Sequence, residues 1–596
     1  MYEKNNQLKD KILSDENASI SSEPKKEPNS KHTSTKTLNL LSNPQYDLSR
    51  PIRQLSSFQS QSFTLLERKI VRTTSMMVAP IEYLTTIFNY TIGYGTLWRF
   101  PYYFQLCHGG IFFIPFLIFY FLIGIPLLTM ESALGQIFKA NPDEMLTKIK
   151  KKLYGLGLVS NISSFVINVY LSVITSWCVY FFFVSFKAPL PWDIEFEGQP
   201  NHLLNKDFFS HQIINIDYDN NTNNITLGSI NTTLLICLLI TWVLLCLVTY
   251  LDIKINSKML YVTSISPIVL LVIVLFELLK LPHVFSKEIW FFIWPSFGRL
   301  LDYKVWFYAC NQAVFILMLG FGGNVIFSAK KNENEDVYKR SIYISFTQLI
   351  MGVVCTLINC IVCGYMANEL NIDDISNLPF NKASLPFIVY PFALGMMKYS
   401  NLWSLLFFAM MIVISIQSQM IFIEGLSVSI SQYSNSILSI KGGNIIICIF
   451  GFLFGIPFIT QGGFFLLEWV DRYSTMIPLF LVILMETLII VRTIGVRAIR
   501  EIIANKTGMV LPGYVLASIG MLCPITMGIL MVICFIYHIC DLPNNVIFFI
   551  LQWVCMVYPF VLVFYFFIKK QNEDNRRKDN EVRNIIANST EMQKLS

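Results

Sequence analysis

Two glycine-rich segments interrupt long apolar stretches of this sequence, and each could make backbone groups available for binding. The first reads Gly93-Tyr94-Gly95 and is followed by Trp98-Arg99-Phe100-Pro101; the second reads Gly320-Phe321-Gly322-Gly323. Glycine in a helix interior costs about 1 kcal/mol relative to alanine, so clustered glycines favour unwinding. Unwound backbone offers carbonyl groups to cations and N–H groups to anions. The alternative interpretation is close packing of helices through small residues.

A charged pair is expected beside the first of these segments. Arg99 stands near an apolar stretch, where an arginine is costly unless it reaches water or pairs with an acid. Asp471, just inside a later apolar stretch, is the candidate partner. Glu82, Glu131 and Glu424 also lie in or near apolar runs. We expect these three acids to be structural hydrogen-bond anchors rather than ligands of a solute.

Membrane helices are the elements that would position these residues. Apolar residues make up 54% of the 596-residue chain and charged residues 14%, whereas soluble proteins carry about 25% charged residues. A bilayer span needs about 20 mainly apolar residues. About twelve stretches meet this criterion: residues 79–104, 111–136, 156–186, 230–250, 258–279, 303–328, 341–368, 402–430, 444–460, 464–491, 510–536 and 545–569.

The glycine-rich segments fall in the first and the sixth stretch. This spacing is expected of two inverted repeats, formed by spans one to five and six to ten. We therefore predict an all-α membrane protein with about twelve transmembrane helices, a five-plus-five inverted repeat and interrupted helices one and six. The segment from Leu385 to Met397 is too short to span and is expected to be a re-entrant or external helical element.

Basic residues orient the predicted helices. The positive-inside rule places the basic loops, and with them both termini, in the cytoplasm. Residues 1–75 are then a disordered cytoplasmic tail, residues 76–570 the transmembrane domain, and residues 571–596 a second cytoplasmic tail. The basic residues follow the second, sixth and tenth spans: Lys148, Lys150, Lys151, Lys152; Lys330, Lys331, Lys339, Arg340; Arg492, Arg497, Arg500, Lys506.

Several classes of partner and chemistry are disfavoured. The net charge of +6 is small, and no basic stripe alternates with aromatic residues, so nucleic acid is not an expected partner. The chain shows no nucleophile–base constellation, phosphate loop or metal motif, so it is not expected to be an enzyme. The predicted external loop, residues 187–230, is acidic, lacks cysteine and carries sequons at Asn220 and Asn224, with a third at Asn231.

The stretch from Ile81 through Tyr102, with its Gly-Tyr-Gly and Trp-Arg-Phe-Pro motifs, resembles the first helix of the neurotransmitter:sodium symporter family. The likeness covers about residues 75 to 570. Further matches fall in the family's order: Gly109-Gly110, Gly124-Ile125-Pro126 and Glu131 through Gln136 in helix two; Ser176-Trp177 and Leu190-Pro191-Trp192 in and after helix three; Gln312 through Gly322 in helix six; Gln417-Ser418-Gln419 and Glu424-Gly425 in helix eight; Gly462-Gly463, Asp471 and Tyr473 in helix ten.

The resemblance implies a substrate site at mid-membrane between helices one, three, six and eight. It implies that Arg99 and Asp471 form an external gate, that Phe321 caps the substrate from above and that Phe315 lines the pocket. The implied substrate-binding residues are Tyr90, Thr91, Gly93, Gly95, Ile167, Leu171, Phe315, Ile316, Met318, Phe321, Ser418 and Phe422.

The implied pocket favours a compact amino acid. Family members that carry amines have an aspartate at the position of Gly93, and a glycine there leaves room for the carboxylate of the substrate. The family's substrate-contacting tyrosine of helix three is replaced by Leu171, although the preceding Tyr170 is retained. Met318 replaces a small residue, and its flexible side chain would fill part of the site.

The ion sites of the family are unequally retained. Its first sodium site would use Thr96, Ile316 and Gln348, and its chloride site Phe116, Ile316, Gly352 and Gln312; Ile316 has no side-chain oxygen. Its second sodium site would use Asn89, Ile92, Ile414, Gln417 and Ser418, the first three through backbone carbonyls. We therefore expect one sodium site and no chloride requirement. A proton is the alternative coupling ion, although Gln417 stands where a carboxylate would carry it.

The resulting hypothesis is a secondary active transporter of small amino-acid-like solutes, coupled to sodium. The alternatives are a non-transporting receptor or sensor on the same fold, which the altered pocket would permit, and a channel, which the paired gate residues disfavour. We expect a multi-pass integral membrane protein whose partners are the lipid bilayer and a small solute. The plasma membrane is favoured over an internal membrane, and the sequence makes no prediction of oligomeric state.

Overall fold

The structure, a computed structural model, describes residues 93, 95–192, 209, 228–251, 257–280, 290, 294, 297–330, 336–369, 384–434, 438–507, 510–540 and 546–595. The described residues all belong to one compact unit, and residues 1–56 lie outside them. The described residues are mainly helical, with one isolated bridge between Ile230 and Thr460 and no β-strand among them. The predicted tail 1–75 and most of the loop 187–230 lie outside them.

The first predicted span is irregular where its sequence is rich in glycine. After Gly93 the chain forms a π-helical turn, η1 (Gly95–Arg99), and continues as α5 (Phe100–Leu106). Pro101 stands in the first turn of α5, where its missing N–H group is not required. The second span is built from η2 (Gly109–Phe112), α6 (Phe113–Phe119), η3 (Tyr120–Gly124) and α7 (Ile125–Phe138).

A long, buried third helix organises the first half of the bundle. Helix α9 (Tyr154–Val184) is apolar around most of its circumference, as expected of a helix enclosed by others. It packs against α18, α11, α20 and α24. The neighbouring elements are α8 (Pro142–Ile149), η4 (Lys151–Leu153), α11 (Thr232–Tyr250) and α12 (Ser257–Leu278). The side chain of Asn231, the third predicted sequon, caps α11.

The second half begins with another interrupted helix. Helices α14 (Tyr303–Ile316) and α15 (Gly323–Ala329) are separated by the second glycine-rich segment. The short predicted element is helix α17, and it is buried. The elements around this pair are η6 (Phe297–Leu301), α16 (Val337–Glu369), α17 (Leu385–Gly395), α18 (Ser400–Tyr433), α19 (Ile440–Gly455), η8 (Ile456–Ile459) and α20 (Gly463–Ile489).

The last helices lie outside the two predicted repeats. Helix α24 continues beyond residue 570 into the polar residues up to Leu595. The elements of this part are η9 (Ile490–Ile494), α21 (Val496–Thr507), α22 (Gly513–Ala517), η10 (Ser518–Leu522), α23 (Cys523–Cys540) and α24 (Val546–Leu595).

Nine helices of the described chain are long and apolar enough to cross a bilayer. Helix α12, whose apolar part is shorter, the broken pair α14–α15, and the first span, described only from Gly93, correspond to the remaining predicted spans. The chain is therefore an all-α, multi-pass membrane protein, as predicted. Its interruptions lie in the first and sixth spans, where the glycines were expected to place them.

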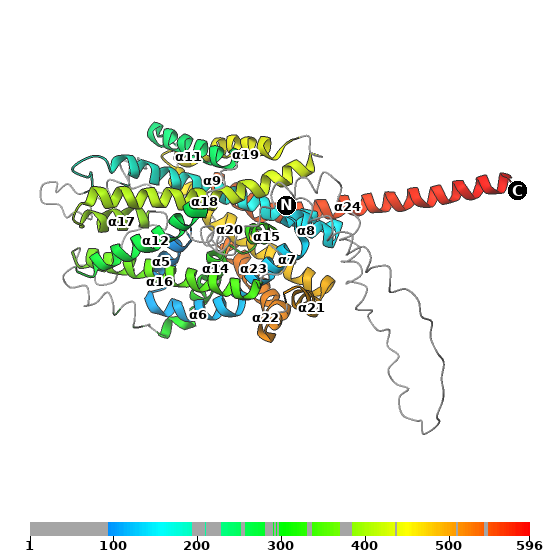
Figure 1. Ribbon diagram of the computed structural model, residues 1–596, viewed down its shortest axis with the longest axis horizontal. Coiled ribbons are helices and arrows are strands. Elements are labelled where there is room, and N and C mark those ends of the chain that lie inside the picture. Colours follow the sequence, from blue (N-terminus) through cyan, green and yellow to red (C-terminus); the bar gives the residue numbers. More distant parts are fainter. Residues whose placement is uncertain are drawn as a thin grey trace, which may run out of the picture. The chain divides into compact units, whose positions relative to one another are not determined.

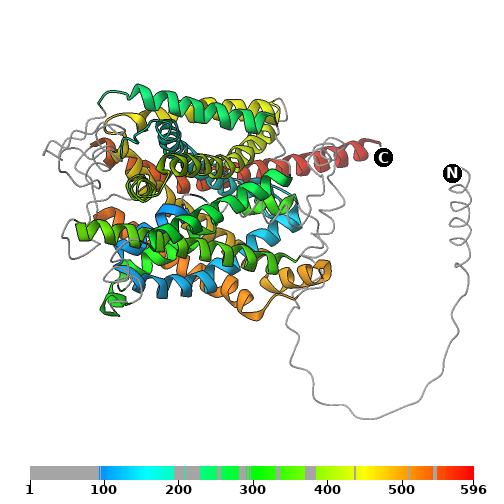
Figure 2. The ribbon, with the colours of Figure 1, turned by 60° about the vertical axis from the view of Figure 1, so that its left-hand side comes forward.

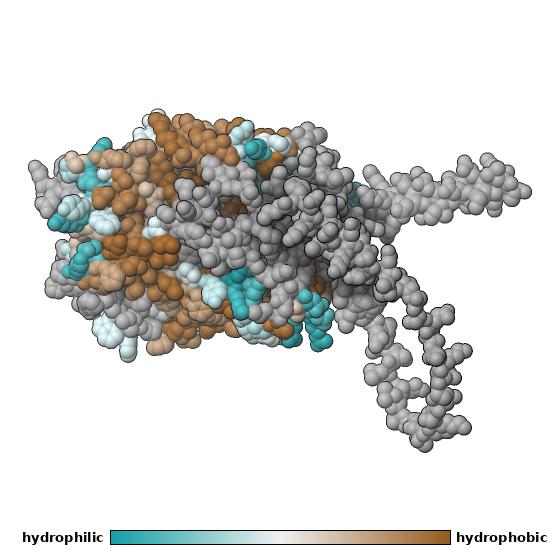
Figure 3. Space-filling view, viewed as in Figure 1, coloured by the Kyte–Doolittle hydropathy of each residue, from teal (hydrophilic) through white to brown (hydrophobic). Residues whose placement is uncertain are grey.

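The outer helices cover the inner ones. Helices α11 and α19 lie side by side against α9 and α18 (Figures 1 and 2). They expose large apolar side chains, including Ile236 and Leu239 of α11 and Phe450 and Phe454 of α19. Brown, apolar surface accordingly covers much of the described face in Figure 3. Such a surface is suited to lipid, because lipid tails are as apolar as the side chains that face them.

Candidate functional site

The break in the sixth span depends on backbone conformations that favour glycine. Gly320 and Gly322 have φ angles of 77° and 79°, in the left-handed region. Met318, with φ 51°, adopts the same region although it carries a side chain. A side chain at Gly322 would also collide with Pro142 of α8. The chain therefore turns sharply between α14 and α15, and Met318 is held in a conformation that is costly for a residue with a Cβ atom.

Side chains from α7 and α9 bind the backbone of this break. The Gly320 N–H group donates to Glu131 Oε1 at 2.6 Å. Ser160 Oγ donates to the Gly320 carbonyl, and Ser164 Oγ donates to the Phe321 carbonyl, both at 2.9 Å. Irregular backbone inside a membrane persists only where such partners or water are present. These bonds confirm the expectation that Glu131 is a hydrogen-bond anchor.

Asn324 binds the carbonyls on the other side of the break. Its Nδ2 atom lies 3.2 Å from both the Leu317 and the Met318 carbonyl oxygens, and 3.0 Å from Glu131 Oε2. The carbonyls of residues 317, 318, 320 and 321 are thus hydrogen-bonded to side chains. The sequence analysis expected the unwound backbone at this break to offer free carbonyl groups to a cation. In this conformation fewer of them are free.

Helix α8 covers the break from another side, outside the candidate membrane spans. Its Asp143 side chain is buried, and Gly157 of α9 is in close contact with the Asp143 backbone. Burial raises the pKa of Asp143 above the usual aspartate value, although a hydrogen bond with Ser429 acts in the opposite direction. The packing of α8 links the break to the loop between the second and third spans.

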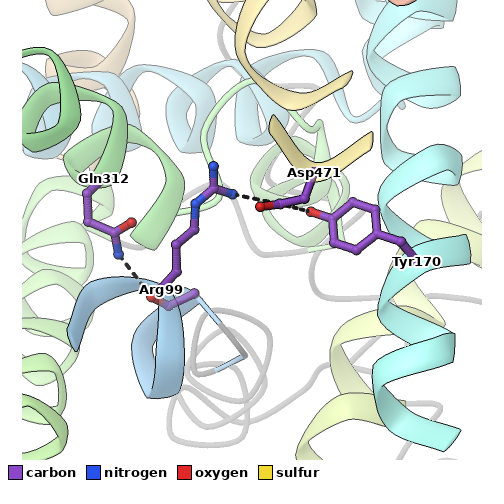
Figure 4. A network of polar contacts seen from close by, with 5 residues as sticks. Arg99, Tyr170, Gln312 and Asp471 are labelled. Carbon is purple, nitrogen blue, oxygen red and sulfur yellow. Dashed lines mark hydrogen bonds and ion pairs between the residues drawn. The ribbon is translucent and has the colours of Figure 1, made fainter. Parts of the chain in front are cut away.

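The first break lies against the sixth span. The Gly93 carbonyl accepts bonds from the N–H groups of Thr96 and Leu97, at 3.1 and 3.3 Å. Gln312 Nε2 of α14 donates to the Gly95 carbonyl at 2.9 Å (Figure 4). A Cβ atom at Gly95 would lie only 3.0 Å from the ring of Phe315. A glycine is therefore needed for this close approach of the two interrupted spans.

An ion pair lies beside this junction. Arg99 Nη1 is 3.3 Å from Asp471 Oδ1, and Tyr170 Oη donates to the same oxygen at 2.9 Å (Figure 4). Arg99 is 1% exposed and Asp471 3%, so neither charge is hydrated by bulk solvent. The guanidinium carbon lies 3.8 Å from the ring centroid of Phe315, which adds a cation–π contact. This arrangement joins the first, third, sixth and tenth spans.

A small cavity lies next to the ion pair. Its volume is about 20 Å³, close to the space that one water molecule occupies. Both glycines of the first break line it, together with side chains from α9, α14 and α18. The lining residues are Gly93, Gly95, Arg99, Tyr170, Leu171, Phe315, Met318, Ser415, Ser418 and Asp471. The geometry is that of a closed site, too small in this conformation for an amino acid.

The structure brings together part of the expected substrate site. Six of the expected residues line the cavity with the two gate residues: Gly93, Gly95, Leu171, Phe315, Met318 and Ser418. Four do not line it, although all four are buried: Ile167, Ile316, Phe321 and Phe422. Tyr90 and Thr91 lie outside the described residues, as do Asn89, Ile92 and Glu82.

Phe315 lines the cavity, as expected, whereas Phe321 does not. Phe315, rather than Phe321, lies under Arg99 beside the ion pair. The Phe321 carbonyl is bound by Ser164, six residues before Tyr170 on α9, which corresponds to about 9 Å along a helix. Phe321 packs its ring on Phe422, with centroids 6.3 Å apart. The cap role expected for Phe321 stays a prediction; in this conformation the sharp turn at Gly320 places its ring on Phe422, while Phe315 lies under Arg99.

The described part of the second predicted ion site contains adjacent oxygen atoms. Ser418 Oγ donates to the Ile414 carbonyl at 3.0 Å, and Gln417 is buried beside them on α18. A Cβ atom at Gly93 would lie 3.5 Å from Ser418 Oγ. Helix α18 therefore presents the Ser418 hydroxyl to the first break.

At the first predicted ion site, the polar residues bond to each other and the third residue is apolar. Thr96 Oγ1 donates to Gln348 Oε1 at 3.0 Å, and both residues are fully buried. Ile316 is also buried, and a Cβ atom at Gly352 would lie 3.7 Å from its Cδ1 atom. The ring of Phe116, from the predicted chloride site, packs on three other aromatic rings: Phe100, Phe112 and Tyr120.

Two polar features were missed by the sequence analysis. Ser415, which lines the cavity, contacts Thr175 of α9, and Gln419 Nε2 donates to Ser415 and to Thr175, at 2.6 and 2.8 Å. Glu486 is buried within α20 and interacts electrostatically with Glu131. An acid within an apolar span is a functional candidate by default, and that signal would have found Glu486. Only packing brings the hydroxyl groups of α9 and α18 together.

These features define an integral, multi-pass membrane protein with two interrupted helices around a closed cavity that has both apolar and polar lining residues. A model of the sodium:neurotransmitter symporter family matches residues 76–570. The chain therefore belongs to this family, in agreement with the resemblance of its first helix.

Similar proteins include three transporters from animals. The chain is 26% identical over 467 residues to the sodium- and chloride-dependent GABA transporter ine of Drosophila melanogaster, covering 74% of this chain and 48% of the fly protein. It is 27% identical over 455 residues to the sodium- and chloride-dependent glycine transporter 2 of Xenopus laevis, covering 68% and 57%. It is 27% identical over 426 residues to the sodium- and chloride-dependent GABA transporter 2 of Rattus norvegicus, covering 66% and 68%. The chain thus spans about half the length of the fly relative.

Proposed function

We propose that this chain is a secondary active transporter that moves small amino-acid-like solutes together with sodium. The observation that carries the proposal is the closed cavity between the two broken helices, with the Arg99–Asp471 pair on its boundary. Broken helices at the centre of a bundle place backbone groups where a solute and an ion bind. Relatives that transport GABA and glycine support the same class of solute.

We propose that the solute is compact and carries a carboxylate. Gly93 leaves space beside Ser418, where an acidic side chain would repel such a group. Leu171 and Met318 add apolar bulk to the lining. The closed cavity has to open before any amino acid enters, so binding and the conformational change are coupled.

We propose a single sodium site at α18. The Ser418 hydroxyl, the Gln417 side chain and the Ile414 carbonyl supply oxygens there, and the first break, through Asn89 and Ile92, would supply the others. At the first site, Thr96 and Gln348 bond to each other, and Ile316 offers no oxygen. An ion buried without ligands that replace its hydration shell is unstable, so this position does not favour sodium.

We also propose that transport does not require chloride, although the names of the relatives include it. The predicted chloride position holds Phe116, Ile316 and Gly352, whose side chains offer no hydrogen-bond donor. The Gln312 amide, the retained residue of that site, donates to the Gly95 carbonyl. An anion beside a sodium ion chiefly balances its charge, so loss of the first sodium removes the reason for the anion.

The proposed topology places both termini in the cytoplasm, with residues 1–75 and 571–596 as cytoplasmic tails around a transporter domain of residues 76–570. The basic residues after the second, sixth and tenth spans support this orientation. We favour the plasma membrane as the location.

Uptake by the purified full-length protein in proteoliposomes tests the function. Labelled glycine and GABA are supplied with an inward sodium gradient, and choline replaces sodium in the control. We expect sodium-driven accumulation that collapses when an ionophore dissipates the gradient. Binding of a solute without accumulation would instead support the receptor hypothesis. Uptake that proceeds equally in choline would contradict sodium coupling.

A further inference from the structure

A second, larger cavity lies near the ends of three apolar spans. Its volume is about 670 Å³, and it is formed by η4 and the residues just before it, the end of α20 with η9, and α24. The apolar spans that contain these elements run over Lys151–Val184, Gly463–Ile494 and Phe549–Glu573. The cavity therefore lies at the boundary between the apolar bundle and the solvent, far along α20 from Asp471.

Four basic residues line this cavity. Lys150, Lys151 and Lys152 come from one side and Arg492 from the other, and the lining contains no acidic residue. Within the described part of the chain none of these four has an ion-pair partner, whereas the nearby Lys148 pairs with Glu144 at 2.7 Å. Four positive charges around one cavity attract an anion with several negative charges.

The rest of the cavity is apolar. Met485, Leu488 and Ile489 of α20 and Phe567 of α24 line it, and Leu488 remains 39% exposed. Lys152 Nζ lies 5.3 Å from the ring centroid of Phe567, so its charge lies next to these apolar side chains. An inorganic anion would make no favourable contact with these apolar side chains. A molecule with a charged headgroup and hydrocarbon chains would place the headgroup on the basic residues and the chains on the apolar ones.

We propose that this cavity binds an anionic phospholipid whose headgroup carries additional phosphate. The headgroup phosphates contact the three lysines and Arg492, and an acyl chain lies on Met485, Ile489 and Phe567. Basic pockets between membrane helices are suited to such headgroups. In the proposed topology the cavity faces the cytoplasmic leaflet, where anionic lipids are concentrated. This site shares no lining residue with the closed cavity at the ion pair.

A titration of the full-length protein in detergent with a short-chain phosphatidylinositol bisphosphate tests the proposal. The variant Lys152→Gln/Arg492→Gln removes one charge from each side of the cavity. The matched control is Arg497→Gln/Arg500→Gln, which removes the same charge from exposed positions on α21 outside the cavity. We expect the first variant to bind about tenfold or more weakly, and the control to bind like the unaltered protein.

Titrations with two further compounds identify which part of the ligand is recognised. Soluble inositol trisphosphate presents the headgroup without acyl chains, and short-chain phosphatidylcholine presents chains without net charge; both should bind much more weakly than the anionic lipid. Equal binding of the free headgroup would assign the site to a soluble phosphate compound and overturn the lipid proposal. Equal loss in the two double variants would overturn it as well, because binding would then follow total charge. Size-exclusion profiles and sodium-driven uptake confirm that both variants are folded.

Discussion

The hydroxyl of Thr96 donates to the side-chain oxygen of Gln348, at 3.0 Å, across the space between the first span and α16. Both side chains are fully buried, so each satisfies a polar group of the other away from water. Two potential ion ligands thus bind each other. This relationship, together with Ile316, is the physical basis for expecting one sodium ion rather than two.

Ion dependence tests this interpretation. Sodium-driven uptake should follow a Hill coefficient close to one, and gluconate should replace chloride without reducing the rate. The reason is that only the position at Ser418 retains neighbouring oxygens from side chain and backbone. Initial rates measured over a sodium series, and separately over a chloride series, provide the check. A Hill coefficient well above one, or a clear chloride requirement, would contradict it.

The variant Thr96→Ala separates structure from ion binding. Loss of the hydroxyl removes one donor to Gln348 Oε1 and should lower stability by roughly 1–3 kcal/mol, while the sodium Hill coefficient stays unchanged. Thr129→Ala is the control, because Thr129 is equally buried but, among the described residues, its hydroxyl donates to the Ile125 carbonyl of its own helix, at 2.8 Å. Thermal unfolding and sodium-dependent uptake are measured for both. A Thr96 variant with an altered Hill coefficient would place this threonine in an ion site.

The Arg99–Asp471 pair should be essential for transport. Removing one partner of a buried ion pair leaves the other charge uncompensated, at a cost of roughly 3–5 kcal/mol. We expect Arg99→Ala to abolish uptake while the protein still elutes as a folded species, because the proposed gate would be lost from the boundary of the closed cavity. Tyr170→Phe is the milder comparison, since it removes a single hydrogen bond to Asp471. Unimpaired uptake by Arg99→Ala would disprove the proposed gate.

Met318 should set the size of the accepted solute. It lines the small cavity and has a φ angle of 51°, which a glycine would adopt without strain. Met318→Gly should therefore admit larger amino acids, detected as competition with the transported solute. Phe422→Ala is a useful control, because Phe422 is buried nearby but does not line the cavity. If bulky aromatic amino acids already compete well against the unaltered protein, this prediction is wrong.

Much of the fold could be predicted from the sequence, because it depends on the lengths of the apolar stretches and on the positions of the glycines. Apolar stretches long enough to span a bilayer predicted the helices, and Gly320 and Gly322 predicted the break that their positive φ angles produce. The short helix α17 followed from a stretch too short to cross. These features are local, so neighbouring residues determine them.

The site was less accessible, because it depends on how separate helices pack. Apolarity alone could not show that Phe315 rather than Phe321 lies under Arg99. Likewise, Ser415 was one hydroxyl among several on α18 until packing placed it against Thr175. Asp471 could be named as a candidate partner of Arg99 from its place just inside an apolar stretch, but only packing shows that the two side chains meet, 3.3 Å apart.

Glu131 and Glu486 are buried acids in two different spans, and their hydrogen bonding predicts opposite effects of mutation. Glu131 accepts from the Gly320 N–H group and from Asn324. Within the described residues, the buried Oε2 atom of Glu486 has no hydrogen-bond partner. A buried polar group with partners is costly to disturb, whereas one without partners can be replaced by an apolar group of similar shape at little cost.

Glu131→Gln should therefore lower the thermal stability of the detergent-solubilised protein, because an amide turns one acceptor into a donor that faces other donors. Glu486→Met should leave stability unchanged or raise it, and Glu486→Gln controls for the loss of the acid with the shape retained. Loss of stability in Glu486→Met equal to that in Glu131→Gln would contradict the difference seen in the structure. Uptake is measured for the same variants. A stable Glu486→Met protein that no longer transports would show that the acid is used in the transport cycle, since its removal does not damage the fold.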